Sequence, residues 1–350
     1  MTRPRLVNLL DDFALGGVSR GLGIFDSAAV RAVVHPSVVA IRPDAIVAPR
    51  LDADIIVTHF PPSWRRLAFL VSLGLRNPQA RIIHVEHSYT RAWEAAKVPA
   101  RRRFRLMLGL SCRMVDQIVC VSQAQARWLE QAARLDPRRI EVIYPFAENR
   151  GIDDLALPDF QRAAPLRVGA YGRFHEAKGF DRLIRAWRDG AMPGTELLIG
   201  GFGPQESELR ALAASVPGIR FVGRIDDVPA FLAQCDIVAV PSRWEAFGQV
   251  ATEARQAGRP ILVAPVDGLP EQVGSAGMVV DFASLGAVER AFASLDPLRL
   301  AVMAREARRA TAVAGPIRQR EWARLLSRLT APCRRAAARA VAATPQLTHR

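Results

Sequence analysis

Two glutamates in one short stretch are the residues best suited to chemistry in this chain. Glu245 and Glu253 are separated by seven residues within 241–254. Glu245 falls in a loop after a predicted apolar strand, and Glu253 falls one to two turns into a helix predicted from near Gly248. Backbone N–H groups and the dipole at such a helix start suit a phosphate, and nearby carboxylates accept hydrogen bonds from sugar hydroxyls. The stretch therefore predicts a site for a sugar attached to a nucleotide.

A second motif, in residues 172–179, follows the apolar run 166–171 and contains Arg173 and Lys178. Of the 48 basic residues, 46 are Arg, and the two Lys are Lys97 and Lys178. An ammonium is a compact point charge, whereas a guanidinium is a planar fork. We interpret Arg173 and Lys178 as a clamp on a diphosphate. Taken alone, the motif leaves open an ordinary solvated turn between a strand and a helix.

The bulk composition predicts a globular protein large enough for two domains. The chain has 350 residues, and no apolar run approaches the roughly 18 residues of a membrane helix. Asp11 and Asp12 interrupt the brief apolar start, so a secretory signal is not expected. The cysteines lack Cys-x-x-Cys spacing, which favours reduced thiols in a cytoplasmic protein. They are Cys112, Cys120, Cys235 and Cys333.

The net charge of +14 is unevenly distributed. Residues 1–150 carry 22 basic and 13 acidic side chains, and residues 151–304 carry 15 basic and 19 acidic ones. Residues 305–350 carry 11 basic and 2 acidic side chains. The basic ends, and a basic amphipathic helix predicted over 101–114, favour an anionic partner. They lack interleaved aromatic residues and any nucleic-acid module, so nucleic acid is not expected. We therefore keep the hypothesis that the protein binds peripherally to the anionic inner face of the plasma membrane.

Strands and helices alternate in both halves, which predicts parallel sheets covered on both faces. Ligands in such sheets bind at the carboxyl ends of the strands, and the singled-out residues all follow strands. We expect a first domain over 1–150, a linker over 151–165 and a second domain over 166–315. A helix over 316–330, which could cross back to the first domain, and a basic tail over 331–350 complete the chain.

Individual elements follow from the apolar pattern. In the first half, strands are expected over 5–10, 54–59, 81–87, 118–122 and 140–145. In the second half, they are expected near 166–171, 195–200, 219–223, 236–240, 260–264 and 277–280. Gly315 and Pro316 are expected to end one C-terminal helix before a second one begins.

Several motifs together resemble retaining glycosyltransferases of the GT-B fold, glycosyltransferase family 4. The resemblance is dense from about 117 to 275. It rests on 118–122, Gly172-Arg173 with Lys178-Gly179, 200–204, 221–223, the Glu245 and Glu253 pair, 257–260 and Pro270-Glu271. It implies an α/β protein with two Rossmann-like doubly wound domains facing a central cleft. The first domain would hold the acceptor and the second the nucleotide-sugar donor.

The resemblance also implies residue roles. Arg173 and Lys178 would hold the donor diphosphate, Glu253 the ribose, and Glu245 the hydroxyls of the transferred sugar. His87, at the end of a strand, would reach the donor sugar from the first domain. Glu245, His87, Lys178 and Arg173 form the expected catalytic set.

The resemblance implies further donor contacts in three places. Backbone N–H groups of Phe247, Gly248 and Gln249 would support the sugar and phosphate. The turn at Arg224 and Ile225 would flank the base, and Gly16 and Gly17 would approach the diphosphate from the first domain.

The resemblance implies a hexosyltransferase that uses a UDP- or GDP-linked sugar and a glycan or lipid-linked acceptor, with retention of configuration, in polysaccharide or glycolipid synthesis. No Asp-x-Asp motif lies near the donor half, so neither a metal nor another cofactor is expected. A sugar-nucleotide epimerase of the same fold is an alternative, and a basic nucleic-acid-binding protein is a more distant one.

Overall fold

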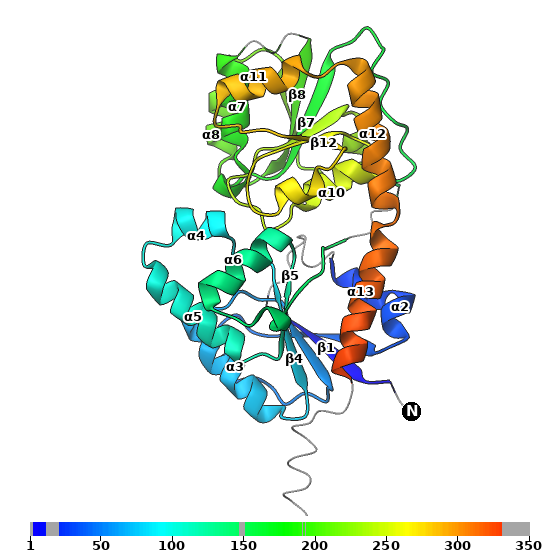
Figure 1. The fold of residues 1–350 in the computed structure, drawn as a ribbon. Coiled ribbons are helices and arrows are strands. Elements are labelled where there is room, and N and C mark those ends of the chain that lie inside the picture. The colour runs from blue at the N-terminus through cyan, green and yellow to red at the C-terminus, as the bar shows by residue number, and fades with distance from the viewer. Residues whose placement is uncertain (1–2, 12–20, 147–150, 191, 193, 331–350) are drawn as a thin grey trace, which may run out of the picture.

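The computed structural model describes residues 3–11, 21–146, 151–190, 192 and 194–330. Two six-stranded parallel sheets, one in each half of the chain, form two domains stacked end to end (Figure 1). Helices cover the faces of each sheet, as parallel strands joined by crossovers require. The predicted α/β class is confirmed.

The first sheet has the strand order β2-β1-β3-β4-β5-β6. Its strands are β1 (Arg5–Leu10), β2 (His35–Ala40), β3 (Ile55–Thr58), β4 (Arg81–Glu86), β5 (Gln117–Cys120) and β6 (Ile140–Val142). The helices are η1 (Leu22–Asp26), α2 (Ala28–Arg31), α3 (Trp64–Arg76), α4 (Arg91–Lys97), α5 (Arg101–Arg113), α6 (Gln123–Ala133) and η2 (Pro137–Arg139). The sequence pattern did not reveal β2, an edge strand that contains Pro36, or the short helix α4.

The second sheet has the order β12-β11-β10-β7-β8-β9. Its strands are β7 (Leu166–Arg173), β8 (Thr195–Phe202), β9 (Ile219–Gly223), β10 (Ile237–Val240), β11 (Ile261–Val263) and β12 (Gly277–Val279). The helices are η3 (Glu176–Lys178), α7 (Phe180–Asp189), α8 (Glu206–Ala213), α9 (Val228–Ala233), α10 (Gln249–Gln256), η4 (Leu269–Gln272) and α11 (Leu285–Ala293). The strand order reverses between β7 and β10, and such switch points are where open α/β sheets bind ligands.

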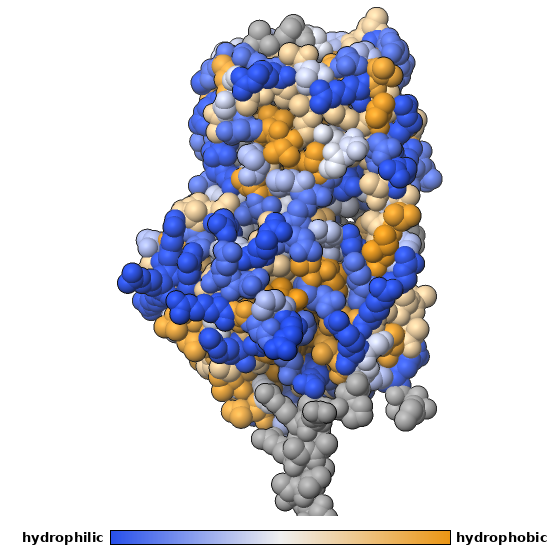
Figure 2. Space-filling model, in the orientation of Figure 1, coloured by the Kyte–Doolittle hydropathy of each residue, from blue (hydrophilic) through white to orange (hydrophobic). Residues whose placement is uncertain are grey.

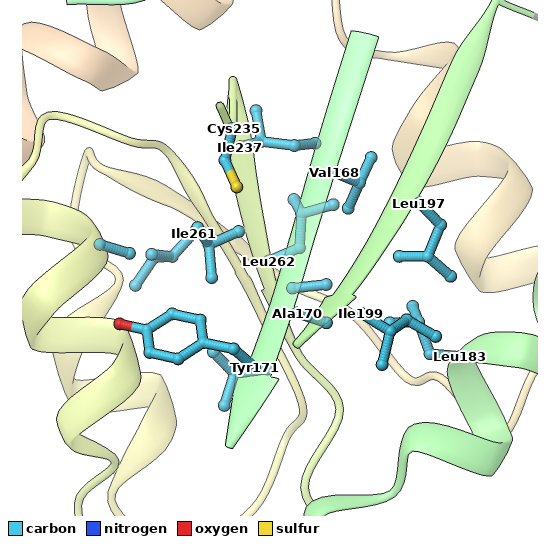
Figure 3. Packing of buried hydrophobic residues seen from close by; sticks show 14 of the residues in the cluster. Val168, Ala170, Tyr171, Leu183, Leu197, Ile199, Cys235, Ile237, Ile261 and Leu262 are labelled. Atoms are coloured by element: carbon cyan, nitrogen blue, oxygen red, sulfur yellow. The ribbon is translucent and has the colours of Figure 1, made fainter. Parts of the chain in front are cut away.

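The hydrophobic core of the second domain includes β7 and β10. Val168, Ala170, Ile199 and Ile237 are fully buried between the helices on either face (Figure 3). Near-continuous apolar runs of this kind are typical of parallel strands covered on both faces. The two strands therefore provide a rigid base for the loops that follow them.

The C-terminal helices connect the two domains. Helix α12 (Pro297–Ala312) packs on α10, and α13 (Ala314–Leu329) packs on α2 and η1 of the first domain. The break lies at Val313, so the expectation of a break at Gly315 and Pro316 is wrong. Those two residues lie in the first turn of α13, where proline is tolerated because its missing N–H has no helical partner.

Replacing Trp322 tests whether α13 is part of the first domain. Trp322 is buried, and its ring centroid lies 4.8 Å from that of Phe25 in η1. We expect Trp322→Ala to lower the free energy of unfolding by about 3–5 kcal/mol, because a large core side chain is lost. Urea denaturation followed by circular dichroism measures this change. Arg324→Ala, on the exposed face of the same helix, is the control and should change it by less than about 0.5 kcal/mol. Equal effects of both substitutions would contradict this packing.

Candidate active site

The loops after β7 and β10 are packed together at the switch point. Gly179 has a φ of 64°, and a Cβ added there would lie 2.2 Å from the carbonyl oxygen of Pro241. The backbone N–H of Arg243 donates to the carbonyl of Ala177 over 2.7 Å. Only glycine fits this close approach at a positive φ, so Gly179 fixes how the two loops meet.

This packing brings together the lysine and the first glutamate singled out in the sequence. The Lys178 ammonium forms an ion pair with Glu245 Oε2. Ser242 Oγ donates to the same oxygen over 3.3 Å. The side chains of Lys178 and Glu245 keep 30% and 16% of their exposure, so both remain accessible to a ligand.

A second ion pair, which the sequence analysis missed, supports the first. Both terminal nitrogens of Arg243 lie 2.7 Å from the carboxylate oxygens of Asp181, in the first turn of α7. Burial would raise the pKa of Asp181, but the hydrogen bonds and charge of Arg243 hold it below its usual value. A paired, oriented guanidinium of this kind holds the two loops in register. The signal in the sequence was an acidic residue in the first turn of the helix after Lys178.

Glu253 lies in a different setting from Glu245. It is only 1% exposed, one turn into α10, and its Oε2 accepts a hydrogen bond from the Tyr171 hydroxyl over 2.6 Å. Tyr171 is near the carboxyl end of β7, two residues before Arg173. Glu253 thus lies near the carboxyl end of β7, as Lys178 and Glu245 do. Its role toward a ribose stays a prediction.

The turn into α10 is held by Gln272. Its amide nitrogen donates to the carbonyl oxygens of Phe247 over 2.6 Å and of Gly248 over 3.0 Å. Gly248 has a φ of 97°, and a Cβ there would lie 2.6 Å from Leu269. Helix α10 begins at Gln249, and its N-cap residue, Gly248, has no side chain that could cap the first N–H groups. Phe247, Gly248 and Gln249 all line a cavity between the domains.

This cavity, of about 180 Å³, has walls from both domains. Glu245 and residues 246–249 form the side that belongs to the second domain. Phe25, His59, Trp322 and His87 belong to the opposite side. Of the expected catalytic residues, Glu245 and His87 therefore face one common space.

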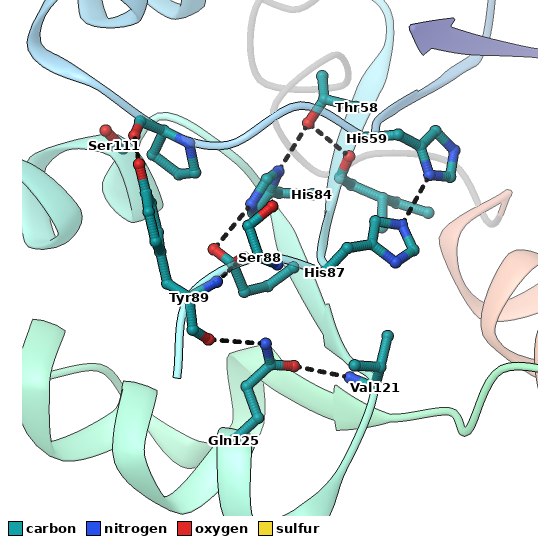
Figure 4. Close-up of polar contacts among 12 residues, drawn as sticks. Thr58, His59, His84, His87, Ser88, Tyr89, Ser111, Val121 and Gln125 are labelled. Atoms are coloured by element: carbon teal, nitrogen blue, oxygen red, sulfur yellow. Dashed lines mark hydrogen bonds and ion pairs between the residues drawn. The ribbon is translucent and has the colours of Figure 1, made fainter. Parts of the chain in front are cut away.

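His87 belongs to a chain of polar groups at the carboxyl ends of β3 and β4 (Figure 4). Its Nε2 lies 3.2 Å from Nδ1 of His59, and Nε2 of His59 lies 2.9 Å from Oδ1 of Asn8. Burial lowers the pKa of His87 to about 4, although the charge of Glu86 opposes the shift. Burial and the neighbouring imidazole of His87 also hold the pKa of His59 well below its usual range. Both rings are thus neutral near pH 7.

Arg173 and the residues expected near the base lie at the rim of the second sheet. The Arg173 guanidinium is exposed and has no ion pair or hydrogen bond within the described parts of the chain. Phe202 pairs with Arg173 in the sheet, and its ring lies 5.0 Å below the Arg224 guanidinium. Ile225 packs where a Cβ on Gly200 would stand, at 2.6 Å. These residues share one edge of the sheet with Lys178.

Two expectations are not tested by these contacts. Gly16 and Gly17 lie outside the described residues. Within the described ranges, no group of three or more His, Cys, Asp or Glu side chains is arranged to hold a metal ion. The expectations of no metal and no other cofactor stay predictions.

Both halves of the chain match known families of glycosyltransferases. Residues 35–148 match the family described as Glycosyltransferase Family 4, and residues 165–295 match Glycosyl transferases group 1. A D-inositol 3-phosphate glycosyltransferase from Mycobacterium sp. (strain JLS) is 32% identical over 49% of this chain and 42% of its own length. A GDP-mannose-dependent monoacylated alpha-(1-6)-phosphatidylinositol monomannoside mannosyltransferase from Corynebacterium glutamicum is 28% identical over 68% of this chain and 67% of its own length.

Solved structures share the fold at low sequence identity. A glycosyltransferase from Rickettsia africae has a TM-score of 0.71 at 14% identity, covering 95% of this chain and all of its own. Anabaena HepE in complex with UDP-glucose has a TM-score of 0.69 at 20% identity, covering 93% of this chain and all of its own. The expected GT-B fold, with two facing doubly wound domains, is confirmed. From the two family matches and this fold, we conclude that the chain belongs to the group 1 glycosyltransferases.

Proposed function

We propose that this protein transfers a hexose from a UDP- or GDP-linked sugar to a glycan or lipid-linked acceptor, with retention of anomeric configuration. The observation that carries the proposal is the Lys178–Glu245 ion pair, formed by the two loops at the switch point of the donor sheet. The names of relatives support it: one is GDP-mannose-dependent, and a structural neighbour was solved with UDP-glucose.

The donor would bind along the carboxyl edge of the second sheet. Arg173 and Lys178 would neutralise the diphosphate, which would compete with Glu245 for the Lys178 ammonium. Glu245 would then accept hydrogen bonds from sugar hydroxyls. The N–H groups that open α10 from Gln249 would supply further donors to the phosphate or sugar.

The proposed reaction needs no protein nucleophile. The bond between the anomeric carbon and the diphosphate oxygen breaks as the acceptor oxygen bonds to the same face of that carbon. The acceptor proton passes to the departing phosphate oxygen. The positive groups of Lys178 and Arg173 would stabilise the charge that develops on the leaving group, and one such contact is commonly worth about 10²–10³ in rate.

His87 would act as a neutral hydrogen-bonding group. Its pKa of about 4 keeps the ring uncharged at neutral pH. His59 contacts Nε2 of His87, and His87 lines the cavity, so its other ring nitrogen would be the one that binds the sugar. A neutral imidazole can bind a sugar hydroxyl without placing a positive charge beside the oxocarbenium-like centre.

Membrane association is part of the proposal, because one surface combines charge with exposed apolar groups. Leu75 is 76% exposed on α3 and Leu106 is exposed on α5, beside Arg101, Arg102 and Arg103. Figure 2 shows apolar residues over α3 next to hydrophilic side chains over α5. No helix among the described residues is both long and apolar enough to cross a membrane. This surface would bind an anionic bilayer and bring the site close to a lipid-linked acceptor.

Removing either member of the ion pair tests the proposed function. We expect Lys178→Ala and Glu245→Gln to lower the transfer rate about 10²–10³-fold, because each removes a contact made to the reacting donor. Thermal shift with UDP- and GDP-sugars first identifies the donor, since a ligand of the folded state raises Tm. Arg290→Ala, on the exposed surface of the donor domain, should match the wild type. Wild-type rates in both site variants would contradict the proposal.

The same assay distinguishes transfer from epimerisation. With donor and acceptor present, we expect a glycoside whose anomeric coupling constant, measured by NMR, matches that of the donor. An altered sugar nucleotide formed without acceptor would instead identify an epimerase. A product with the opposite coupling would contradict retention.

The half-buried His87 predicts a specific acid sensitivity. The folded pKa of His87 is about 4 against an ordinary 6.5, so its contribution to stability is present above pH 6.5 and is lost as the pH falls toward 4. That contribution amounts to up to about 3 kcal/mol. We expect His87→Gln to show a smaller drop in Tm between pH 7 and pH 4.5 than the wild type. His35→Gln, at an exposed histidine, is the control, and identical drops in both variants would contradict the assignment.

Vesicle binding tests the membrane surface. Replacing Arg101, Arg102 and Arg103 with Gln should weaken binding to phosphatidylglycerol vesicles about a hundredfold, at about 1 kcal/mol per charge. Co-sedimentation at low salt measures the loss. Replacing the exposed Arg188 and Arg220 of the donor domain should have little effect. Equal binding to phosphatidylcholine vesicles, or no binding at all, would exclude this surface.

A further inference from the structure

One loop of the donor domain reaches the first domain through two carboxylates. Glu271 accepts hydrogen bonds from the backbone N–H groups of Gln123 over 2.9 Å and Ala124 over 2.6 Å. The Tyr144 hydroxyl donates to Glu271 over 2.9 Å. The first N–H groups of a helix lack internal partners, and Ser122 caps only that of Gln125 in α6. Glu271 therefore acts as a second cap for α6, supplied by the other domain.

Asp267 accepts hydrogen bonds from both domains. Its Oδ1 accepts from the backbone N–H of Ala92, in the first turn of α4, over 3.1 Å. Its Oδ2 accepts from the backbone N–H of Glu245, also over 3.1 Å. A single carboxylate thus connects the first domain to the residue that we assign to the donor sugar.

The backbone around Asp267 is held in a costly conformation. Asp267 has a φ of 45°, and a non-glycine residue in this region is uncommon outside sites that hold it there. At Gly268, an added Cβ would lie 2.2 Å from the carbonyl oxygen of Ala246 and 2.8 Å from Cβ of Ser122. The N–H of Gly268 also donates to the carbonyl of Glu245 over 3.2 Å. The loop is therefore fitted between the first domain and the Glu245 loop.

We propose that Asp267, Gly268 and Glu271 form an interdomain clasp that positions Glu245 when the two domains come together. Glu271 and Tyr144 anchor the loop to the first domain, and Asp267 transmits that contact to the backbone of Glu245. Asp267 and Glu271 are positioning residues in this account, since they act through Glu245. What Glu245 does to the donor rests on the proposed function, but the coupling itself does not.

Another contact between the domains offers a matched control. Lys97 of α4 pairs with Glu176, and its ammonium lies 5.3 Å from the Trp244 ring centroid. The Lys97 and Glu176 side chains keep 38% and 45% of their exposure. Such exposed pairs contribute little to stability. Neither residue hydrogen-bonds to the backbone of Glu245 within the described residues, so losing this pair should leave the clasp in place.

Amide hydrogen exchange of the full chain, read by fragmentation mass spectrometry, tests the coupling. In Glu271→Ala, we expect the Glu245 amide to exchange at least tenfold faster, although Glu271 does not touch it. In Lys97→Met, the Glu245 amide should stay within twofold of the wild type. Faster exchange confined to Gln123 and Ala124 in Glu271→Ala would overturn the proposal.

Two substitutions at Asp267 complete the test. Asp267→Gly and Asp267→Ala should both speed exchange at Ala92 and Glu245, and the Gly variant should have the higher Tm because glycine tolerates a positive φ. If the Ala variant does not fold, the Gly variant carries the test. Unchanged exchange at Glu245 in the Gly variant would refute the clasp.

The kinetic readout separates the clasp from the proposed function. With a donor identified by thermal shift, Asp267→Gly should lower kcat at least tenfold and leave the donor KM within twofold. A merely structural role would instead lower the amount of folded enzyme and leave its kcat unchanged, which would count against the clasp. If exchange is coupled and no nucleotide sugar binds the wild type, the proposed function fails and the clasp stands.

Discussion

The contact between the loops after β7 and β10 is the one on which the rest of the candidate site depends. Gly179 has no side chain, so the first loop lies against the carbonyl of Pro241 and Lys178 reaches Glu245. A charge that leaves bulk water needs an opposite charge or hydrogen-bond donors. Asp181 is nearly buried, and its charge is compensated by Arg243. This second ion pair also fixes the register of the two loops. Two charged groups can then be presented to a ligand from a rigid base.

The same requirement explains how the domains meet. Glu271 lies on the free N–H groups of α6, and Asp267 lies between an amide of α4 and that of Glu245. Helix α13 leaves the donor domain and becomes part of the core of the first domain. The two halves are thus connected by the chain that passes from α12 into α13 and by carboxylate contacts at the cleft. In the proposed clasp, the contacts between the domains and the position of Glu245 depend on the same carboxylates.

Local patterns predicted the parallel sheets and the loops that carry Lys178 and Glu245, because buried strands are apolar and site loops follow them. The edge strand β2 was not predicted, since its alternating exposure and Pro36 give a weak signal. Pro316 misled the placement of the helix break, because the first turn of a helix accepts proline. Asp181, Asp267 and His59 could not be assigned, because each acquires its role from partners far away in the sequence. Burial of Glu253 beneath Tyr171 likewise depends on packing and not on spacing.

A crystal structure of the protein with a bound nucleotide sugar tests the central claim most directly. The account predicts the diphosphate against Arg173 and Lys178, the hexose against Glu245 in the cavity shared with His87, and the Lys178–Glu245 pair opened by the ligand. A nucleotide bound away from the carboxyl ends of β7 and β10, with that ion pair intact, would contradict it.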